Sequence, residues 1–361
     1  MGIRKEKVME RADDKRLQEL RDNGNELYSI SKLDSINNCL YSSYLTYRLD
    51  NRGSNNIYAI MGGKLHDVLE GMANGVNTKE DLLPAMQSEL DDMDMLDIKF
   101  PSDKIRDSWI QNITHFCETF DFPKGKNFDT EQLFIYKTDD GHYIQGYIDL
   151  IDNVNENVID IYDHKSSSMY SSHDMDEHAR QLIVYMLGKQ QEGFKVNKIA
   201  WHFMKYVSIT YPDLKGNIKT KIVERKKIAE EMEKYVDRVL TLNGYDEFDA
   251  DIFMVDFKRT NKFDCLPEKV REQFTMAPCI VEYEVDNEII EDCKKYIHDT
   301  IALWESLEGK DVSAYPPRKF YKIQKNGKTV PDYFFCSQLC SHFRDCRYIH
   351  DFLETLPKKE E

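Results

Sequence analysis

Two short apolar runs lie within the stretch GYIDLIDNVNENVIDIYDHK, residues 146–165. They belong to two predicted strands, at residues 142–151 and 157–165. Asp152-Asn153 between the runs is typical of a hairpin turn. The stretch therefore predicts two antiparallel strands that pair with each other.

Charged residues end both predicted strands: Asp149 in the first, and Asp163 and Lys165 in the second. Paired strands bring their ends together, so we expect the two carboxylates to lie side by side, where they repel unless a cation sits between them. Carboxylate oxygens suit Mg²⁺ or Mn²⁺, which stabilise charge developing on a phosphodiester. Residues two apart on a strand face the same side, so Lys165 can hold the attacking water or the scissile phosphate.

A histidine on an earlier helix offers a further ligand. Residues 57–75 predict a glycine-punctuated helix that carries His66, and an imidazole suits Mn²⁺ somewhat better than Mg²⁺. Taken alone, a D-x-K at a strand end is typical of a surface ion pair, and a helical histidine is typical of a structural residue. Their order and placement together favour a catalytic metal site.

The surrounding elements predict a mixed sheet covered by helices on both faces. Further strands are expected at residues 130–137, 198–209 and 279–285, with a basic strand pair beyond 210, and helices at 31–50, 103–120, 174–191, 227–243 and 286–308. Ser35 or Asp34 is the expected N-cap of the helix at 31–50. The acidic residues 78–98 predict a helical insertion or lid, and residues 245–256 an acidic loop.

Composition excludes two broad classes of protein. Of the 361 residues, 41% are hydrophobic and 12% aromatic, which is too apolar for disorder over the whole length. No window approaches the ~18 consecutive apolar residues of a membrane span. The N-terminal stretch lacks the apolar segment of a secretory signal, so we expect a cytoplasmic protein.

The formal net charge of −16 argues at first against a nucleic-acid partner. However, residues 195–227 carry nine Lys/Arg against two Asp/Glu, and residues 315–350 carry seven against two. Aromatic residues interleave with these bases, namely Tyr206, Tyr211, Tyr315, Phe320, Tyr321, Tyr333, Phe334 and Phe335. This alternation suits single-stranded nucleic acid, whereas the other interpretation is solvated strands with the aromatics in the core. We expect the two stretches to share one face, beside Asp149 and Asp163.

Three of the eight cysteines cluster as CSQLCSHFRDC, a C-x3-C-x5-C spacing formed by Cys336, Cys340 and Cys346. A disulfide framework is not expected in a chain without a secretory signal. The spacing favours a metal centre over three ordinary cysteines, and either a tetrahedral zinc or an iron–sulfur cubane needs a fourth ligand from elsewhere. Four further cysteines, Cys117, Cys265, Cys279 and Cys293, are expected to be ordinary buried thiols.

Five pieces, in order along the chain, resemble the PD-(D/E)XK nuclease superfamily and specifically its RecB-like branch. They are GGKLHDVLE (62–70), Glu131, GYID (146–149), IYDHK (161–165) and QLIVY (181–185), the last being the Q-x-x-x-Y element of that branch. The resemblance spans about 120 residues. It implies a restriction-endonuclease-like α/β fold, with a mixed central sheet flanked by helices and with helical insertions.

The resemblance also implies roles for individual residues. The catalytic Mg²⁺ or Mn²⁺ would be bound by His66, Asp149, Asp163 and the backbone carbonyl of His164. Lys165 would orient the water or stabilise the transition state, and Gln181 and Tyr185 would contact substrate or brace the site. Glu131 matches a weaker family position and would lie behind the metal ligands.

RecB-like nucleases of the CRISPR-adaptation and AddB-type kinds carry four cysteines that bind a [4Fe–4S] cluster. The resemblance assigns this cluster to Cys39, Cys336, Cys340 and Cys346, with a C-x3-C half one residue longer than the commoner C-x2-C. The cluster would join the N-terminal helix to the C-terminal segment and contribute to folding stability. A zinc-stapled protein with the same fold is the alternative.

On this resemblance the chain divides into four parts. They are an N-terminal helical segment with Cys39 (1–56), the nuclease core (57–210) with a helical insertion (78–125), accessory strands and helices (211–310), and the C-terminal cysteine-cluster segment (311–361).

The function implied is a metal-dependent DNA exonuclease that acts on single strands or DNA ends in recombination, repair, or phage or CRISPR-related processing. A bacterial or phage-infected cell is the expected setting. The chain has no Walker A motif (GxxxxGK[ST]), so it is not itself a helicase, although a helicase or a recombination or CRISPR protein could be its partner. The alternative is a catalytically silent DNA-binding or inhibitory protein on the same fold, and the complete set of His66, Asp149, Asp163 and Lys165 argues against it.

Overall fold

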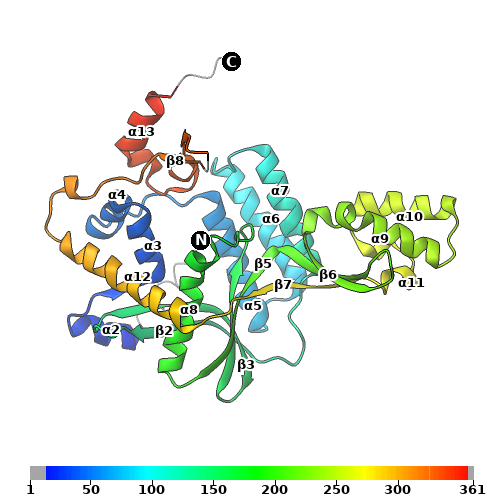
Figure 1. Ribbon diagram of the computed structural model, residues 1–361, viewed down its shortest axis with the longest axis horizontal. Helices are drawn as coiled ribbons and strands as arrows, with labels where there is room; N and C mark the ends of the chain where they lie inside the picture. Colours follow the sequence, from blue (N-terminus) through cyan, green and yellow to red (C-terminus); the bar gives the residue numbers. More distant parts are fainter. Residues whose placement is uncertain (1–13, 325, 357–361) are drawn as a thin grey trace.

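A mixed sheet forms the centre of the computed structural model, which describes residues 14–324 and 326–356 (Figure 1). Within these residues seven strands follow the order β1-β3-β4-β5-β6, with β2 paired to β3 and β7 to β5. Their bounds are β1 Leu27–Tyr28, β2 Phe128–Lys137, β3 Tyr143–Asn155, β4 Val158–Lys165, β5 Lys195–Pro212, β6 Ile218–Glu224 and β7 Thr275–Glu282. The pairs β1–β3 and β4–β5 are parallel and the others antiparallel, which confirms the predicted mixed sheet.

Helices cover both faces of this sheet. On one side α8 (Met175–Gln191), α3 (Ile30–Asn38) and α12 (Asn287–Ser306) pack on one another and share an apolar core with the sheet. On the other side α5 (Ile57–Ala73), α6 (Lys79–Met95) and α7 (Asp103–Thr119) enclose a second core. The acidic stretch at 78–98 is thus helical, as expected. No helix of the described residues is long and apolar enough to cross a bilayer.

The predicted turn at Asp152-Asn153 is wrong. Strand β3 runs on to Asn155, and the turn to β4 lies at residues 156–157. Asp152 is buried instead, where its carboxylate accepts a hydrogen bond of 2.7 Å from Lys126 Nζ. Aspartate favours turns, but strand pairing and the hydrogen bond from Lys126, which lies outside the hairpin, hold Asp152 in a strand.

The predicted acidic loop at 245–256 is also wrong, because residues Glu247–Thr260 form helix α10. The Asp246 carboxylate caps its first turn by accepting from the Asp249 amide, and acidic side chains near a helix N-terminus are favourable. Helix α10 packs on α9 (Ile228–Leu242), and together with α11 (Glu268–Arg271) and β6 they project from one end of the sheet (Figure 1). This unit has an apolar core of its own.

The helix predicted at 31–50 is interrupted at Cys39. Ser29, and not Ser35 or Asp34, caps α3 by accepting from the Lys32 amide. Cys39 is extended, with φ −159°, and a short helix α4 (Leu40–Ser43) and a π turn (Tyr44–Arg48) follow it. The break places Cys39 at the start of α4, where its Sγ accepts from the Ser42 amide.

The C-terminal segment lies against α4 at the top of the view in Figure 1. It consists of the hairpin β8 (Tyr321–Ile323) and β9 (Thr329–Pro331), a π turn (Phe335–Leu339), a 3-10 turn (Phe343–Asp345) and helix α13 (Arg347–Glu354). Residues 1–13 and 357–361, which belong to the outer two parts expected from the sequence, lie outside the described residues. The four-part division stays a prediction.

Candidate active site

The register of the hairpin brings the two predicted carboxylates together, although Asp149 lies within β3 and not at its end as expected, because β3 continues to Asn155. Leu150 pairs with Tyr162, so the next residues on the two strands are Asp149 and Asp163. Asp149 Oδ2 accepts a hydrogen bond of 2.8 Å from the backbone amide of His164. This bond fixes the Asp149 carboxylate beside the end of β4.

His66 reaches the same point from α5. Its Nε2 lies 3.0 Å from the carbonyl oxygen of His164, and its Nδ1 lies 3.6 Å from Asp149 Oδ2. Burial disfavours a charged imidazole, but the Asp149 carboxylate outweighs burial and raises the pKa of His66 to about 9. The site therefore attracts positive charge strongly.

Asp163 and Lys165 face the same side of β4, as the sequence spacing predicts. Lys165 Nζ lies 2.5 Å from Asp163 Oδ2 and donates to Gln181 Oε1 on α8 at 3.1 Å. Gln181 Nε2 in turn donates to the buried Tyr185 hydroxyl at 2.6 Å. The Asp163 side chain is almost inaccessible, and burial raises its pKa to about 6, with Lys165 opposing the shift and Asp149 adding to it. Two carboxylates held this close favour a cation between them.

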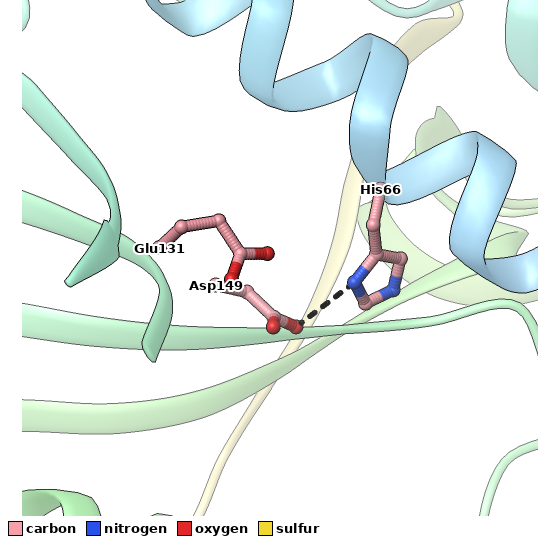
Figure 2. Close-up of side chains that lie close together, drawn as sticks. All are labelled: His66, Glu131 and Asp149. Carbon is pink, nitrogen blue, oxygen red and sulfur yellow. Dashed lines mark ion pairs between the residues drawn. The ribbon is translucent and has the colours of Figure 1, made fainter. Parts of the chain in front are cut away.

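Glu131 lies with the ligands and not behind them. Figure 2 shows Glu131, Asp149 and His66, each offering one ligand atom, and these atoms lie within 4.8 Å of one another. Glu131 stands on β2 opposite Asp149 and adopts φ +50°, which is rare for a non-glycine residue and costs about 1–3 kcal/mol. The sequence does not reveal this role of Glu131, because only the fold shows that its carboxylate lies within ligand distance of His66 and Asp149.

The donor set fits a divalent cation. It combines an imidazole, carboxylates and a backbone carbonyl, which are ligands that Mg²⁺ and Mn²⁺ accept. Within the described residues, His66, Glu131 and Asp149 form the only group of three such ligand atoms this close together, and Asp163 lies outside the group in its ion pair with Lys165.

A comparison with protein families agrees with this geometry. A sequence model of the PD-(D/E)XK nuclease superfamily matches residues 28–274, a range that contains every residue of the site. The chain belongs to the PD-(D/E)XK nuclease superfamily. Membership indicates a metal-dependent nuclease. A search of curated proteins found no match.

A second buried histidine contacts His164, which lies within the D-x-K motif of this chain. His164 pairs in register with His202 of β5, and their Nδ1 atoms lie 3.1 Å apart. Burial lowers the pKa of both imidazoles, that of His164 to about 4, so both rings are neutral and one donates to the other. His202 was missed from the sequence because a histidine within an apolar strand has no distinguishing spacing.

The four cysteines expected to bind a cluster meet in this PD-(D/E)XK chain. Cys39, Cys336, Cys340 and Cys346 all line one small cavity between α4 and the C-terminal segment. The Ser42 amide donates to Cys39 Sγ at 3.4 Å, and the Ser42 hydroxyl lies 4.0 Å from Cys340 Sγ. Of the other thiols, Cys117, Cys279 and Cys293 are buried as expected, whereas Cys265 is only half-buried.

Only part of the aromatic set expected to contact DNA is exposed to solvent. Tyr211 and Tyr315 are buried in apolar cores, so their inclusion is wrong. Tyr321 and Phe334 are about half exposed, at 50% and 51%. Strand pairing and helix packing, which the sequence pattern alone does not specify, decide which aromatic rings reach solvent.

Proposed function

We propose that this chain is a metal-dependent DNA exonuclease of the RecB-like branch, acting on single-stranded DNA or DNA ends. The observation that carries the proposal is the meeting of His66, Asp149, Asp163 and Lys165 at one end of the sheet. The hydrogen bond from Lys165 to Gln181 supports the RecB-like assignment, because it joins the D-x-K element to the Q-x-x-x-Y element.

We assign the cation to His66, Asp149, Asp163 and the carbonyl of His164, with Glu131 beside them. A divalent cation there supplies Lewis-acid stabilisation of a phosphodiester and lowers the pKa of a coordinated water. Asp149 is held for this role by the His164 amide, and His66 by its position on α5. The buried carboxylates are costly without a cation, so binding of the ion relieves their mutual repulsion.

Lys165 supplies the positive charge that faces the scissile phosphate or orients the attacking water. Burial disfavours its ammonium form, but Asp163 outweighs burial and raises the pKa of Lys165, so the group stays charged. Gln181 positions the ammonium by accepting a hydrogen bond from it. The Gln181 amide is held in turn by the hydrogen bond that it donates to the Tyr185 hydroxyl. With Asp163 and Gln181 each engaging one N–H of the ammonium, one N–H of Lys165 is left for the substrate.

We further propose a [4Fe–4S] cluster at Cys39, Cys336, Cys340 and Cys346. A zinc–sulfur distance of about 2.3 Å puts the thiolates around one tetrahedral zinc about 3.8 Å apart. Among the described residues no three cysteine sulfurs lie within 4.8 Å of one another. The wider spacing favours a cubane, in which each thiolate binds a different iron, over the zinc alternative.

The cellular setting belongs to the same proposal. A chain without a Walker A motif would work beside a separate helicase or with recombination or CRISPR proteins, in the cytoplasm of a bacterial or phage-infected cell. The RecB-like motifs support both the proposed partners and the proposed cellular setting.

Degradation of end-labelled single-stranded DNA with Mn²⁺ tests the activity. We expect the wild-type chain to degrade linear strands and to spare circular ones, and Asp163→Asn to lose at least about 100-fold in rate. Asp160→Asn is the matched control, since Asp160 is buried on the same strand but pairs with Lys198 and Asn197. Rapid cleavage of circles would replace the exonuclease by an endonuclease, and DNA binding without cleavage would favour the catalytically silent alternative.

A further inference from the structure

A groove of about 780 Å³ opens beside the candidate active site. It lies between the start of α5, α7, the segment that follows β4, β5 and the cysteine segment, and its lining includes Lys104, Lys205, Lys226 and Phe334. We call it the α5–α7 groove. Its volume falls within the range of about 300–1,000 Å³ of sites that hold small molecules, so it has room for a nucleotide-sized unit.

The groove borders the candidate active site through the residues that follow Lys165. Ser166, Ser167 and Ser168 line it and follow Lys165 directly in the chain. Ser166 also packs against α5, because its Oγ lies only 3.3 Å from where a side chain on Gly62 would begin. Gly62 stands one helical turn before His66, so the floor of the groove and the metal ligands share α5 and the end of β4.

The charge of the groove suits a polyanion. Lys205 Nζ lies 3.4 Å from Ser168 Oγ, and Lys226 Nζ donates to Ser108 Oγ at 2.6 Å, so two ammonium groups are held at its wall. Lys104 is exposed at the rim. Glu224 is the lining carboxylate, and it is engaged by the Asn112 amide at 2.8 Å and by Lys226 at 3.7 Å.

The cysteine segment contributes an aromatic ring to the same groove. Phe334 immediately precedes the turn that carries Cys336, and its side chain is 51% exposed. Neighbouring Phe335 is partly covered and stacks against the Arg318 guanidinium at 4.9 Å. An exposed ring beside fixed lysines is the arrangement that proteins use to stack the bases of a single strand.

We propose that the α5–α7 groove binds a single strand of DNA next to the cleavage site, with Lys205 and Lys226 contacting phosphates and Phe334 stacking on a base. The inference rests on the proposed function and specifies where its substrate runs. It also gives the cysteine segment a direct part in substrate binding, besides its role in joining the two ends of the chain.

Binding of a fluorescent oligothymidylate, measured by anisotropy in Ca²⁺, tests the proposal. We expect Phe334→Ala to weaken binding by about 5- to 150-fold, the range for loss of one base-stacking side chain. Lys205→Gln should reduce the slope of log affinity against log salt by about 0.7, the value for one phosphate contact on a single strand. The matched controls are Phe248→Ala and Lys310→Ala, since both residues are exposed and far from the groove in the chain.

Two further readouts separate this inference from the proposed function. Photocrosslinking with 5-iododeoxyuridine in the oligonucleotide should attach the strand to the peptide that contains Phe334. Hydrolysis of bis(p-nitrophenyl) phosphate, which is too small to span the groove, should fall less in Phe334→Ala than cleavage of the oligonucleotide does. If the wild-type chain cleaves single strands but the groove variants behave like the controls, the groove proposal is overturned. If the wild-type chain neither binds nor cleaves DNA, the proposed function itself fails.

Discussion

At the scale of single residues, the site is built from groups whose ordinary preferences are overridden. Glu131 adopts a left-handed backbone, and Asp163 is a carboxylate removed almost entirely from water. Each is costly in isolation, and both costs fall at the end of the sheet where His66 and Asp149 meet. Strain and buried charge thus coincide with the ligands of the proposed cation.

Glu131→Gln tests whether the strained residue serves the metal. The variant keeps the size of the side chain but loses its charge, so we expect Mn²⁺ affinity to fall by about 10- to 100-fold while the protein stays folded. Isothermal titration with Mn²⁺ measures the loss. Glu156→Gln, in the exposed turn between β3 and β4, is the control, and equal affinities in the two variants would remove Glu131 from the site.

His115 offers a pH prediction away from the metal ligands. Its Nδ1 accepts from the buried Arg225 guanidinium at 3.1 Å, and burial together with Arg225 lowers the pKa of His115 to about 3. The folded state therefore needs a neutral ring, whereas the unfolded chain takes up a proton near pH 6.5. His115 should make the free energy of unfolding fall by up to about 1.4 kcal/mol per pH unit as pH drops from 6.5 toward 3.

Chemical denaturation of His115→Gln across this pH range checks the expectation. The variant should lose that part of the pH dependence, whereas His173→Gln, at an exposed position, should keep it. An unchanged slope in His115→Gln would show that another group carries the acid sensitivity.

At the scale of elements, patterns that depend on neighbours in the chain were predicted well. The helix expected at 174–191 is α8 (Met175–Gln191), and the second motif strand lies where expected, whereas the first extends four residues beyond its predicted end. The two wrong predictions have different causes: Lys126, from outside the hairpin, pairs with Asp152 within a strand, whereas the local cap at Asp246 starts the helix at 247–260 that was expected to be a loop. The site was foreseen through the spacing of His66, Asp149, Asp163 and Lys165, while the backbone twist at Glu131 and the His202 contact required the fold.

One element boundary connects the cysteine segment to the site. Asn56 caps α5 by accepting from the Ala59 amide, and its side-chain amide donates to the Leu339 carbonyl at 2.8 Å. Leu339 lies between Cys336 and Cys340. The cap of the helix that carries His66 is therefore hydrogen-bonded to the loop that carries two of the proposed cluster ligands.

We expect Asn56→Ala to destabilise the protein by about 1 kcal/mol through loss of the cap and, in addition, to lower nuclease activity. Asp246→Ala removes the cap of α10, a helix that carries none of the proposed ligands and does not line the groove, and should cost similar stability without the same loss of activity. Thermal unfolding and cleavage rates measured side by side distinguish the two effects. Equal activity in both variants would show that the cluster loop does not position α5.

At the scale of the whole molecule, the distribution of charged residues says more about a nucleic-acid partner than the net charge does. The net charge of −16 hides a groove lined by Lys104, Lys205 and Lys226, while acidic residues concentrate on helices such as α6 and α10. The first basic stretch contributes Lys205 and Lys226 to this groove, and the second contributes Phe334 but no lysine or arginine. Lys221 of the first stretch lies elsewhere, in an ion pair with Glu231. Cys39 and Cys346, which are 307 positions apart in the sequence, line the same cavity.

The cluster proposal predicts a brown protein after anaerobic purification, with broad absorbance at the violet edge of the visible spectrum. Cys340→Ser should lose this absorbance and unfold at a lower temperature, because binding of the cluster contributes to folding. Cys265→Ser, outside the cavity, should keep both properties. A colourless wild-type protein that contains zinc would contradict the cluster.

The central claim is that cleavage takes place where Asp149, within β3, lies opposite Asp163, near the end of β4. The most direct measurement is the rate of Mn²⁺-dependent degradation of a single-stranded oligonucleotide by Asp149→Asn and by Asp152→Asn, two aspartates of the same strand. We predict that Asp149→Asn loses at least about 100-fold in rate and that Asp152→Asn stays within a few-fold of wild type. Undiminished cleavage by a folded Asp149→Asn variant would contradict the account.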